Sequence, residues 1–443
     1  MPNISEAYHR HANHYLNVLR DLDNRFKQGG ELERASLDLL QIEWENISQG
    51  QDWAQNHIAH GEDIARLTSN LATAGVYLFE IYLHPIEYTQ WLKAALNAAQ
   101  NLGNQLLECN HLLSLGNTYA NMGMPQKAIA CYLDTLSLSQ ELEFDAVMKV
   151  AYGNLGDAYI ELGEMEQALF YLKESQQFLG LEDGKRFDEN ILASFGVYYA
   201  TIGDPHQALT YYKQAFMLAT EINNVHGKGA ILGNIGLAYA DLGDFENAKS
   251  SLEQALITAK QMGDKRFEGQ ILGNIGVVFS DTGNYEEALS CHFQALQISR
   301  EINDRRAEGQ DLGNIGTTYR YLGENRTAIE YHLRALMISR EIGNQREEGR
   351  DLNNIGNACY DLGKTNLALV FYKASLRLLL ATKDLRGVAY TSWSLGLIYA
   401  ENNDFERAIP LLQNCVDYEH KIKHPQAEED ALFLDELKAS LSG

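Results

Sequence analysis

The sequence predicts an all-α solenoid, because one pattern of residues recurs eight times at a fixed spacing of 40 residues. The copies begin at His111, Ala151, Ile191, Ile231, Ile271, Asp311, Asp351 and Thr391. In each copy, apolar residues recur at helical spacing and very small residues lie between them, which is typical of two closely packed helices. Each repeat is therefore expected to form a helix, a tight turn and a second helix.

Small and capping residues support this interpretation. The sixth residue of the repeat is always glycine and the eighteenth is always alanine. A second glycine, such as Gly243 or Gly283, usually stands at the thirteenth position, where the first helix should end. Four residues at one repeat position are expected to cap an early start of the next first helix: Asp264, Asp304, Asn344 and Asp384.

These residues resemble the tetratricopeptide repeat (TPR), whose Leu-Gly, Tyr, Gly and two Ala positions occur in the same order. The period here is 40 rather than 34, and no repeat has a proline near its end. The resemblance covers about three quarters of the chain and implies a right-handed superhelix whose first helices line the concave surface. Such long repeats are similar to those of kinesin light chains, spindle-orientation adaptors and the sensor arrays of bacterial signalling ATPases.

We expect four parts along the chain. Residues 1–69 form a helical N-terminal cap or linker, with helices over Ser5–Phe26 and Glu31–His60, and residues 70–110 form a degenerate TPR-like repeat. The eight repeats fill residues 111–424, and residues 425–443 form a C-terminal capping helix. Helical caps are expected because the end of a repeat array would otherwise expose its apolar face.

The N-terminal part also has a resemblance of its own. The stretch LDLLQIEWENISQGQDWA, residues 37–54, is similar to the segment that joins the winged-helix domain to the repeat sensor in bacterial STAND signalling ATPases. The alternative interpretation is a plain solenoid cap, and the two are compatible.

Composition excludes several classes of function. The net charge is −24, although residues 231–390 hold 18 Lys+Arg against 21 Asp+Glu, so most of the excess lies elsewhere. Such an acidic chain is a poor candidate for binding nucleic acid or an anionic membrane surface. It has no run of 18 apolar residues and no secretory signal pattern, and five scattered cysteines without a CxxC pair indicate reduced thiols in the cytoplasm.

No pattern predicts catalysis, a cofactor or a metal. The fragment GLEDGK at Gly180–Lys185 is one residue short of a phosphate-binding loop and lies between two expected helices. His292 and His332 share a repeat position that is apolar or aromatic elsewhere, so we expect them to be packing residues. Histidines and cysteines lack regular ligand spacing, and no carboxylate is singled out by an apolar setting. We do not expect an enzyme.

Polar residues on the first helices give the more useful signal. Arg266, Gln270 and Asn274 lie at i, i+4 and i+8 and therefore share one helix face. The resemblance to the adaptor families implies that asparagine amides hold a peptide backbone and arginines meet acidic side chains. The candidate binding residues are Asn234, Asn274, Asn314, Asn354, Arg266, Arg306, Arg346, Arg350, Arg386, Gln270 and Gln310. The alternative is that these residues stabilise the array itself, for example by pairing Arg306 with Glu308 or with acids of a neighbouring repeat.

The sequence thus predicts a protein–protein interaction scaffold that binds an extended peptide or partner protein, acidic or of mixed charge, in the concave groove. The second hypothesis is the ligand-sensing module of a bacterial STAND-type signalling system. The chain has no nucleotide-binding motif, so the ATPase would lie on another portion or on a partner. An upstream nucleotide-binding domain would favour the sensor, whereas a self-sufficient start at Met1 would favour a free-standing adaptor.

Overall fold

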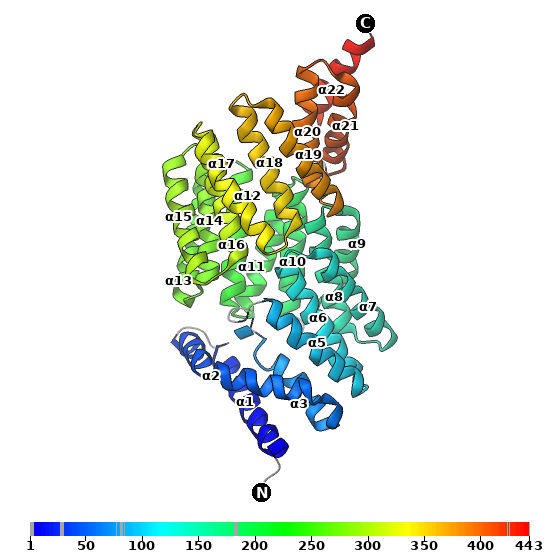
Figure 1. Cartoon of the computed structure of the whole chain (residues 1–443), viewed down its shortest axis with the longest axis vertical. Coiled ribbons are helices and arrows are strands. Elements are labelled where there is room, and N and C mark those ends of the chain that lie inside the picture. Colours follow the sequence, from blue (N-terminus) through cyan, green and yellow to red (C-terminus); the bar gives the residue numbers. More distant parts are fainter. Residues whose placement is uncertain are drawn as a thin grey trace. The chain divides into compact units, whose positions relative to one another are not determined.

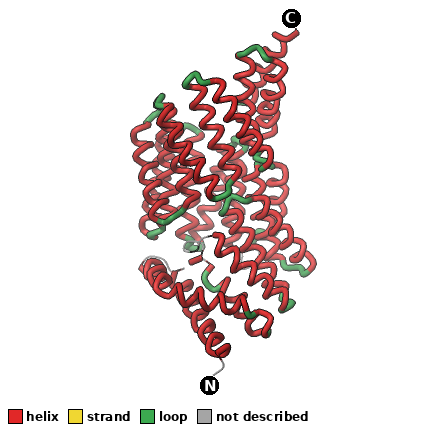
Figure 2. Tube along the Cα trace, in the orientation of Figure 1, coloured by secondary structure: helices red, strands yellow, loops and turns green. Residues whose placement is uncertain are grey.

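The computed structural model describes residues 4–26, 31–76, 78–79, 83, 85–180, 185–422, 424 and 426–442. Over these residues the chain is helical and has no strand, and short loops join the helices (Figure 2). The chain divides into two compact units. Unit 1 comprises residues 1–158, 173–179 and 261–263, and unit 2 comprises residues 159–172, 180–260 and 264–443.

Unit 1 begins with helices that do not follow the repeat. The stretches expected to be helical form α1 (Ile4–Phe26) and α2 (Glu31–Asn56), and a short 3₁₀ turn follows α2. Next come α3 (Glu62–Thr73) and α5 (Pro85–Asn101), which pack against each other. The rings of Trp44 and Trp91 stack with their centroids 5.5 Å apart inside this core. The boundaries that we expect for the four parts of the chain remain a prediction.

Eight helix pairs follow, and Figure 1 labels most of their members. The pairs are α6 (Gln105–Asn121) with α7 (Pro125–Glu141), α8 (Asp145–Leu162) with α9 (Met165–Gln176), α10 (Lys185–Thr201) with α11 (Pro205–Glu221), α12 (Val225–Asp241) with α13 (Phe245–Met262), α14 (Lys265–Asp281) with α15 (Tyr285–Glu301), α16 (Arg305–Tyr321) with α17 (Asn325–Glu341), α18 (Gln345–Asp361) with α19 (Thr365–Ala381), and α20 (Leu385–Glu401) with α21 (Phe405–Ile422). The last helix, α22 (Ala427–Ser442), buries Leu434 in the core of the final repeats.

The turns and caps form as the sequence predicts. The turn glycines have positive φ, for example 75° at Gly243 and 78° at Gly283, a conformation that glycine adopts without strain. In the last repeat Asn403 takes the same conformation, with φ 57°. The side chain of Asp264 accepts a hydrogen bond from the backbone N–H of Phe267, and the three other predicted caps do the same in their helices. The Gly180–Lys185 fragment lies partly outside the described residues.

The sixth-position glycine lets the two helices of a repeat touch. A Cβ atom at Gly276 would lie 2.5 Å from the ring of His292, and one at Gly316 would lie 2.8 Å from the ring of His332. Both histidines are almost fully buried, and burial lowers the pKa of each to about 4. This confirms that they are packing residues.

One expectation is wrong, because two carboxyl groups do occupy an apolar setting. Asp311 and Asp351 are buried at the repeat position that Ile271 holds in the preceding repeat. Ser339 donates a 2.7 Å hydrogen bond to Asp351, and Ser299 donates a 2.9 Å bond to Asp311. Burial is the largest cause that raises the pKa of Asp351 to about 8 and that of Asp311 to about 7.

The first helices of unit 2 stand in a row. Helix α12 contacts α10 and α14, and the contacts continue from α14 through α16 and α18 to α20. Residues at the same repeat position therefore lie on neighbouring helices. None of the described helices is both long and apolar enough to cross a membrane.

Candidate functional site

The four candidate asparagines form a series of half-buried amides on the first helices of unit 2. Asn234, Asn274, Asn314 and Asn354 lie on α12, α14, α16 and α18, and each is half-buried. None of these four amides makes a hydrogen bond with another described residue. A Cβ atom at Gly233 would lie 3.9 Å from Nδ2 of Asn274, so this amide lies next to the small residue of the preceding first helix. We call these four residues the asparagine ladder.

Three of the candidate arginines have a structural role. Arg266 Nε lies 3.0 Å from a carboxylate oxygen of Asp304, the cap of the next first helix. Arg346 repeats this contact with the cap Asp384 at 3.0 Å, and Arg350 joins it at 2.9 Å. Burial raises the pKa of Asp384, but Arg350, Arg346 and the N–H of Gly387 lower it more, so the net pKa is below its usual range. These ion pairs link neighbouring repeats, as the structural alternative predicted.

For two other candidate arginines, Arg306 and Arg386, the residue at the equivalent cap position is not acidic. The cap that follows Arg306 is the neutral Asn344, and the equivalent residue after Arg386 is His424. Arg306 instead approaches Glu161 of α8, with 3.7 Å between Nη2 and Oε1. Arg386 is exposed, and its guanidinium lies over the ring of Tyr390 at 5.8 Å.

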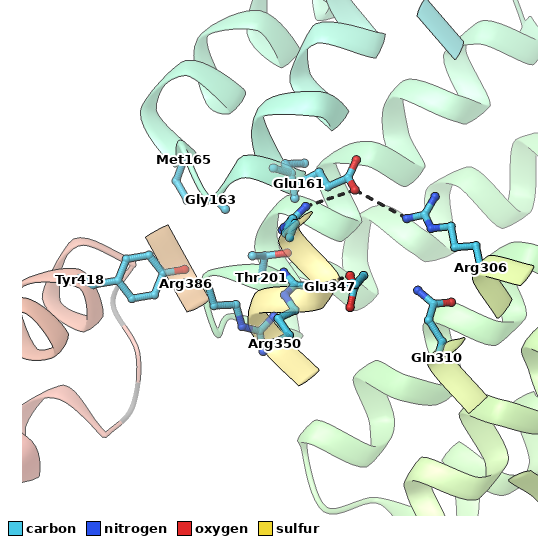
Figure 3. Close-up of a pocket in the computed structure, with 12 residues that line it drawn as sticks. Glu161, Gly163, Met165, Thr201, Arg306, Gln310, Glu347, Arg350, Arg386 and Tyr418 are labelled. Carbon is cyan, nitrogen blue, oxygen red and sulfur yellow. Dashed lines mark hydrogen bonds and ion pairs between the residues drawn. The ribbon is translucent and has the colours of Figure 1, made fainter. Parts of the chain in front are cut away.

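Both arginines line a pocket of about 250 Å³ that lies wholly within unit 2 (Figure 3). Its charged lining consists of four arginines and two glutamates: Arg306, Arg346, Arg350, Arg386, Glu161 and Glu347. Gln310, another candidate, also lines it, whereas Gln270 is exposed elsewhere on α14. Glu161 is the central acid, since its Oε1 also lies 3.2 Å from Nη1 of Arg346. The four arginines outnumber the two lining glutamates, and the buried Asp384, which pairs with Arg346 and Arg350, offsets part of that positive charge.

Sequence reasoning missed Tyr418, which lines the same pocket from α21. Figure 3 shows its ring at one end of the pocket. Tyr418 is only 7% exposed, and its hydroxyl has no hydrogen-bond partner among the described residues. Burial raises its pKa to about 12, so the hydroxyl keeps its proton and is a donor at neutral pH. The equivalent positions of the three preceding repeats are Ile298, Ile338 and Leu378, so the repeat pattern indicates apolar packing at this position.

A further cluster lies at the end of the array, outside the pocket. Cys415, Glu419 and Asp430 place their ligand-type atoms within 4.8 Å of one another. Burial and the nearby Asp430 raise the pKa of Glu419 to about 7, and burial also raises the pKa of Asp430. Both carboxyl groups therefore hold their protons more tightly than an exposed carboxyl group does. The five cysteines are all free thiols.

The repeat geometry agrees with the sequence comparisons. The model of the tetratricopeptide repeat matches residues 107–179, 188–262 and 267–341, just over half of the chain. The chain belongs to the tetratricopeptide repeat family. The TPR array of this protein is thus a protein-interaction module, as the sequence predicted. Comparison with curated proteins found no significant match.

The chain is similar to solved structures at low sequence identity. A Rap protein complexed with Competence and Sporulation Factor is 16% identical, with a TM-score of 0.57 over 82% of this chain and 99% of that one. NprR in complex with its cognate peptide NprX is 18% identical, with a TM-score of 0.48 over 77% of this chain and 98% of NprR. The STAND protein PH0952 from Pyrococcus horikoshii, which has a TPR sensor, is 18% identical, with a TM-score of 0.48. It aligns over 84% of this chain and 55% of PH0952.

Proposed function

We propose that this TPR protein binds an extended peptide, or an extended segment of a partner protein, along the first helices of unit 2. The asparagine ladder is the observation that carries the proposal. An asparagine side chain offers one acceptor and two donors, which match the alternating C=O and N–H groups of an extended backbone. The ladder amides make no hydrogen bond with other described residues, so they are available to a ligand.

Apolar packing does not explain asparagine at four successive equivalent positions. The side chains are half-buried on the row of first helices, and a hydrophobic core would favour small or aliphatic residues there. A net hydrogen bond contributes about 0.5–1.5 kcal/mol. Micromolar binding requires about 8 kcal/mol, so several rungs have to act together with other contacts. The Rap protein, which shares the fold, is solved with Competence and Sporulation Factor bound, and this supports a binding role.

A cytoplasmic, non-enzymatic role is part of the proposal. The matching family is a repeat family rather than an enzyme family, and the five free thiols suit a reducing compartment. Signalling in a bacterial cell is the narrower form of this role that the sequence analysis suggested.

The test is selection from a random peptide library displayed on phage, with the full chain immobilised. Enriched peptides are then measured against the double variant Asn274→Ala/Asn314→Ala. Gln254→Ala/Gln294→Ala is the matched control, because these exposed residues lie on the second helices α13 and α15. We expect the ladder variant to lose the peptides while the control retains them, with circular dichroism showing both folded. Equal binding by both variants, or no enrichment at all, would refute the proposal.

A further inference from the structure

The cluster of Cys415, Glu419 and Asp430 contains a buried carboxyl oxygen that no described residue satisfies. Glu419 is only 2% exposed, and its Oε2 atom has no hydrogen-bond partner among the described residues. Leaving a buried polar atom unpaired costs free energy, so such atoms usually contact a protein group, a water or an ion. The ligand-type atoms of the three residues lie within 4.8 Å of one another, so this carboxyl group faces a thiol and a second carboxyl group.

The two residues of the cluster that lie on α21 occupy positions where other repeats have alanine. Cys415 is equivalent to Ala335, and Glu419 is equivalent to Ala259. Both alanines are fully buried, so packing at these positions requires neither a thiol nor a carboxyl group. Because Cys415 and Glu419 are four residues apart on one helix, their side chains lie on the same face of α21. The last repeat therefore has two ligand-type side chains that its fold does not need.

Among the described residues, no lysine or arginine lies within ion-pair distance of Glu419 or Asp430. The basic side chain that does is that of His424, whose Nδ1 atom lies 3.9 Å from Oε1 of Glu419. The backbone N–H of His424 donates a 2.8 Å hydrogen bond to the C=O of Glu419, which keeps this residue next to α21. Asp430 comes from α22. The last two helices and their connection thus supply a thiol, two carboxyl groups and an imidazole.

This set of donors fits a divalent transition-metal ion. Thiolate sulfur and imidazole nitrogen are preferred ligands of Zn²⁺ and similar ions, whereas Mg²⁺ and Ca²⁺ are bound mainly through oxygen atoms. Four protein ligands of these types also match the four-coordinate geometry of structural Zn²⁺ sites. A bound cation would replace the protons of the thiol and carboxyl groups and would give Oε2 of Glu419 a partner.

We propose that Cys415, Glu419 and Asp430 bind a divalent transition-metal ion, with Zn²⁺ as the best match. His424 supplies the fourth ligand. The ion joins α21 to α22, which already packs against the final repeats through Leu434, and so fixes the C-terminal cap of the array. The site lies on other helices than the asparagine ladder, and it does not depend on the peptide binding proposed above. The sequence spacing of the four ligands follows no regular pattern, so the fold brings them together.

The test is a titration of the full, metal-free chain with Co²⁺ under reducing conditions, followed by absorbance. Co²⁺ substitutes for Zn²⁺ and reports its own ligands, because thiolate ligation gives a near-ultraviolet charge-transfer band and tetrahedral coordination gives strong visible bands. We expect both bands to saturate at one Co²⁺ per chain, to disappear when Zn²⁺ is added and to survive an excess of Mg²⁺ and Ca²⁺. Metal bound by histidines elsewhere in the chain does not produce the thiolate band.

Variants then locate the site. Cys415→Ala is expected to abolish the thiolate band. Glu419→Gln and Asp430→Asn, which keep the side-chain shape, should each weaken Co²⁺ binding by more than about 100-fold. This estimate follows because even residues that only hydrogen-bond to metal ligands change the affinity by about 10–100-fold. The matched controls are Cys359→Ala, since Cys359 is as buried as Cys415 but belongs to no such cluster among the described residues, and Asp435→Asn on the exposed face of α22.

Stability gives a second readout. Zn²⁺ should raise the thermal unfolding midpoint of the wild type and of Cys359→Ala, but not that of Cys415→Ala or Glu419→Gln. Circular dichroism of the metal-free proteins checks that each variant folds, as we expect for Cys415→Ala because alanine occupies this position in other repeats.

Three results would overturn the inference or part of it. If the folded wild type gives no thiolate band, or if Cys415→Ala binds Co²⁺ as tightly as the wild type, the metal site is refuted. If Mg²⁺ or Ca²⁺ displaces Co²⁺, the assignment to a transition metal is wrong. If His424→Ala keeps both the affinity and the visible bands, His424 is not the fourth ligand.

Discussion

Asp351 should make the stability of the array depend on pH between 5 and 7. The carboxyl group is 7% exposed, at a position that is isoleucine in other repeats, and its pKa is raised from about 3.8 to about 8. Between these two values the folded state keeps a proton that the unfolded state releases. Stability therefore falls as pH rises through this window, by about 1.4 kcal/mol for each pH unit.

From pH 5 to pH 7 the cost of Asp351 amounts to about 2–3 kcal/mol. The wild-type curve alone does not isolate it, because His292 and His332 act in the opposite direction. Their pKa values are lowered to about 4 in the folded state, so they add stability as pH rises toward the ordinary value of 6.5. The comparison that isolates the carboxyl group is Asp351→Asn, which keeps the shape but does not titrate.

We expect Asp351→Asn to be close to wild type at pH 5 and more stable by about 2–3 kcal/mol at pH 7. The assay is urea denaturation followed by circular dichroism at pH 5, 6 and 7, comparing transition midpoints because long repeat arrays depart from two-state unfolding. Asp134→Asn, at an exposed site on α7, is the control and should show no such trend. An offset between variant and wild type that is the same at pH 5 and pH 7 would show that the buried carboxyl is ionised throughout.

Two further predictions concern packing and repeat-to-repeat ion pairs. Gly316→Ala should destabilise the protein by about 1–3 kcal/mol, since its Cβ would lie 2.8 Å from the ring of His332. In the same helix, a Cβ atom at Gly313 would meet nothing within 4 Å, so Gly313→Ala should stabilise the protein by up to about 1 kcal/mol. If thermal denaturation showed stability changes of the same sign for both variants, the close-contact explanation would be contradicted. Asp384→Asn retains a capping side chain but leaves Arg346 and Arg350 without their shared buried partner, so a loss of about 3–5 kcal/mol is expected. Asp304→Asn, whose partner Arg266 is 45% exposed, should cost less than about 1 kcal/mol, and equal losses for the two variants in urea denaturation would refute this ranking.

The fold could be predicted from the sequence because the same turn, cap and packing residues recur in eight repeats. The turn glycines, the caps such as Asp264 and the packing histidine His292 are each determined by neighbours within about 40 residues, and all were predicted. The asparagine ladder was also visible, since equivalent positions on stacked helices lie side by side.

The contacts in the pocket and the buried carboxyl groups could not be predicted from the repeat pattern, because they depend on departures from that pattern. Glu161 meets Arg306 and Arg346 across several intervening repeats, and a linear period does not reveal contacts between such distant parts of the chain. The buried acid at Asp311 had a readable signal, however. The preceding repeat pairs Ile271 with Ala259, whereas the next pairs Asp311 with Ser299, so both partners changed together.

The residue that caps the next first helix explains why the candidate arginines divide into two groups. An arginine on the first helix is structural where the next cap is an acid, as for Arg266 and Asp304. Where that cap position is Asn344 or His424, the arginine has no cap carboxylate to pair with; it lines the pocket beside Arg346, which keeps its own ion pair with Asp384. A repeat array can thus change the ion-pair partner of an arginine by replacing an acid one repeat away, without altering the arginine itself. In such arrays, a candidate binding residue should therefore be compared between repeats together with the residue in the next repeat that it pairs with.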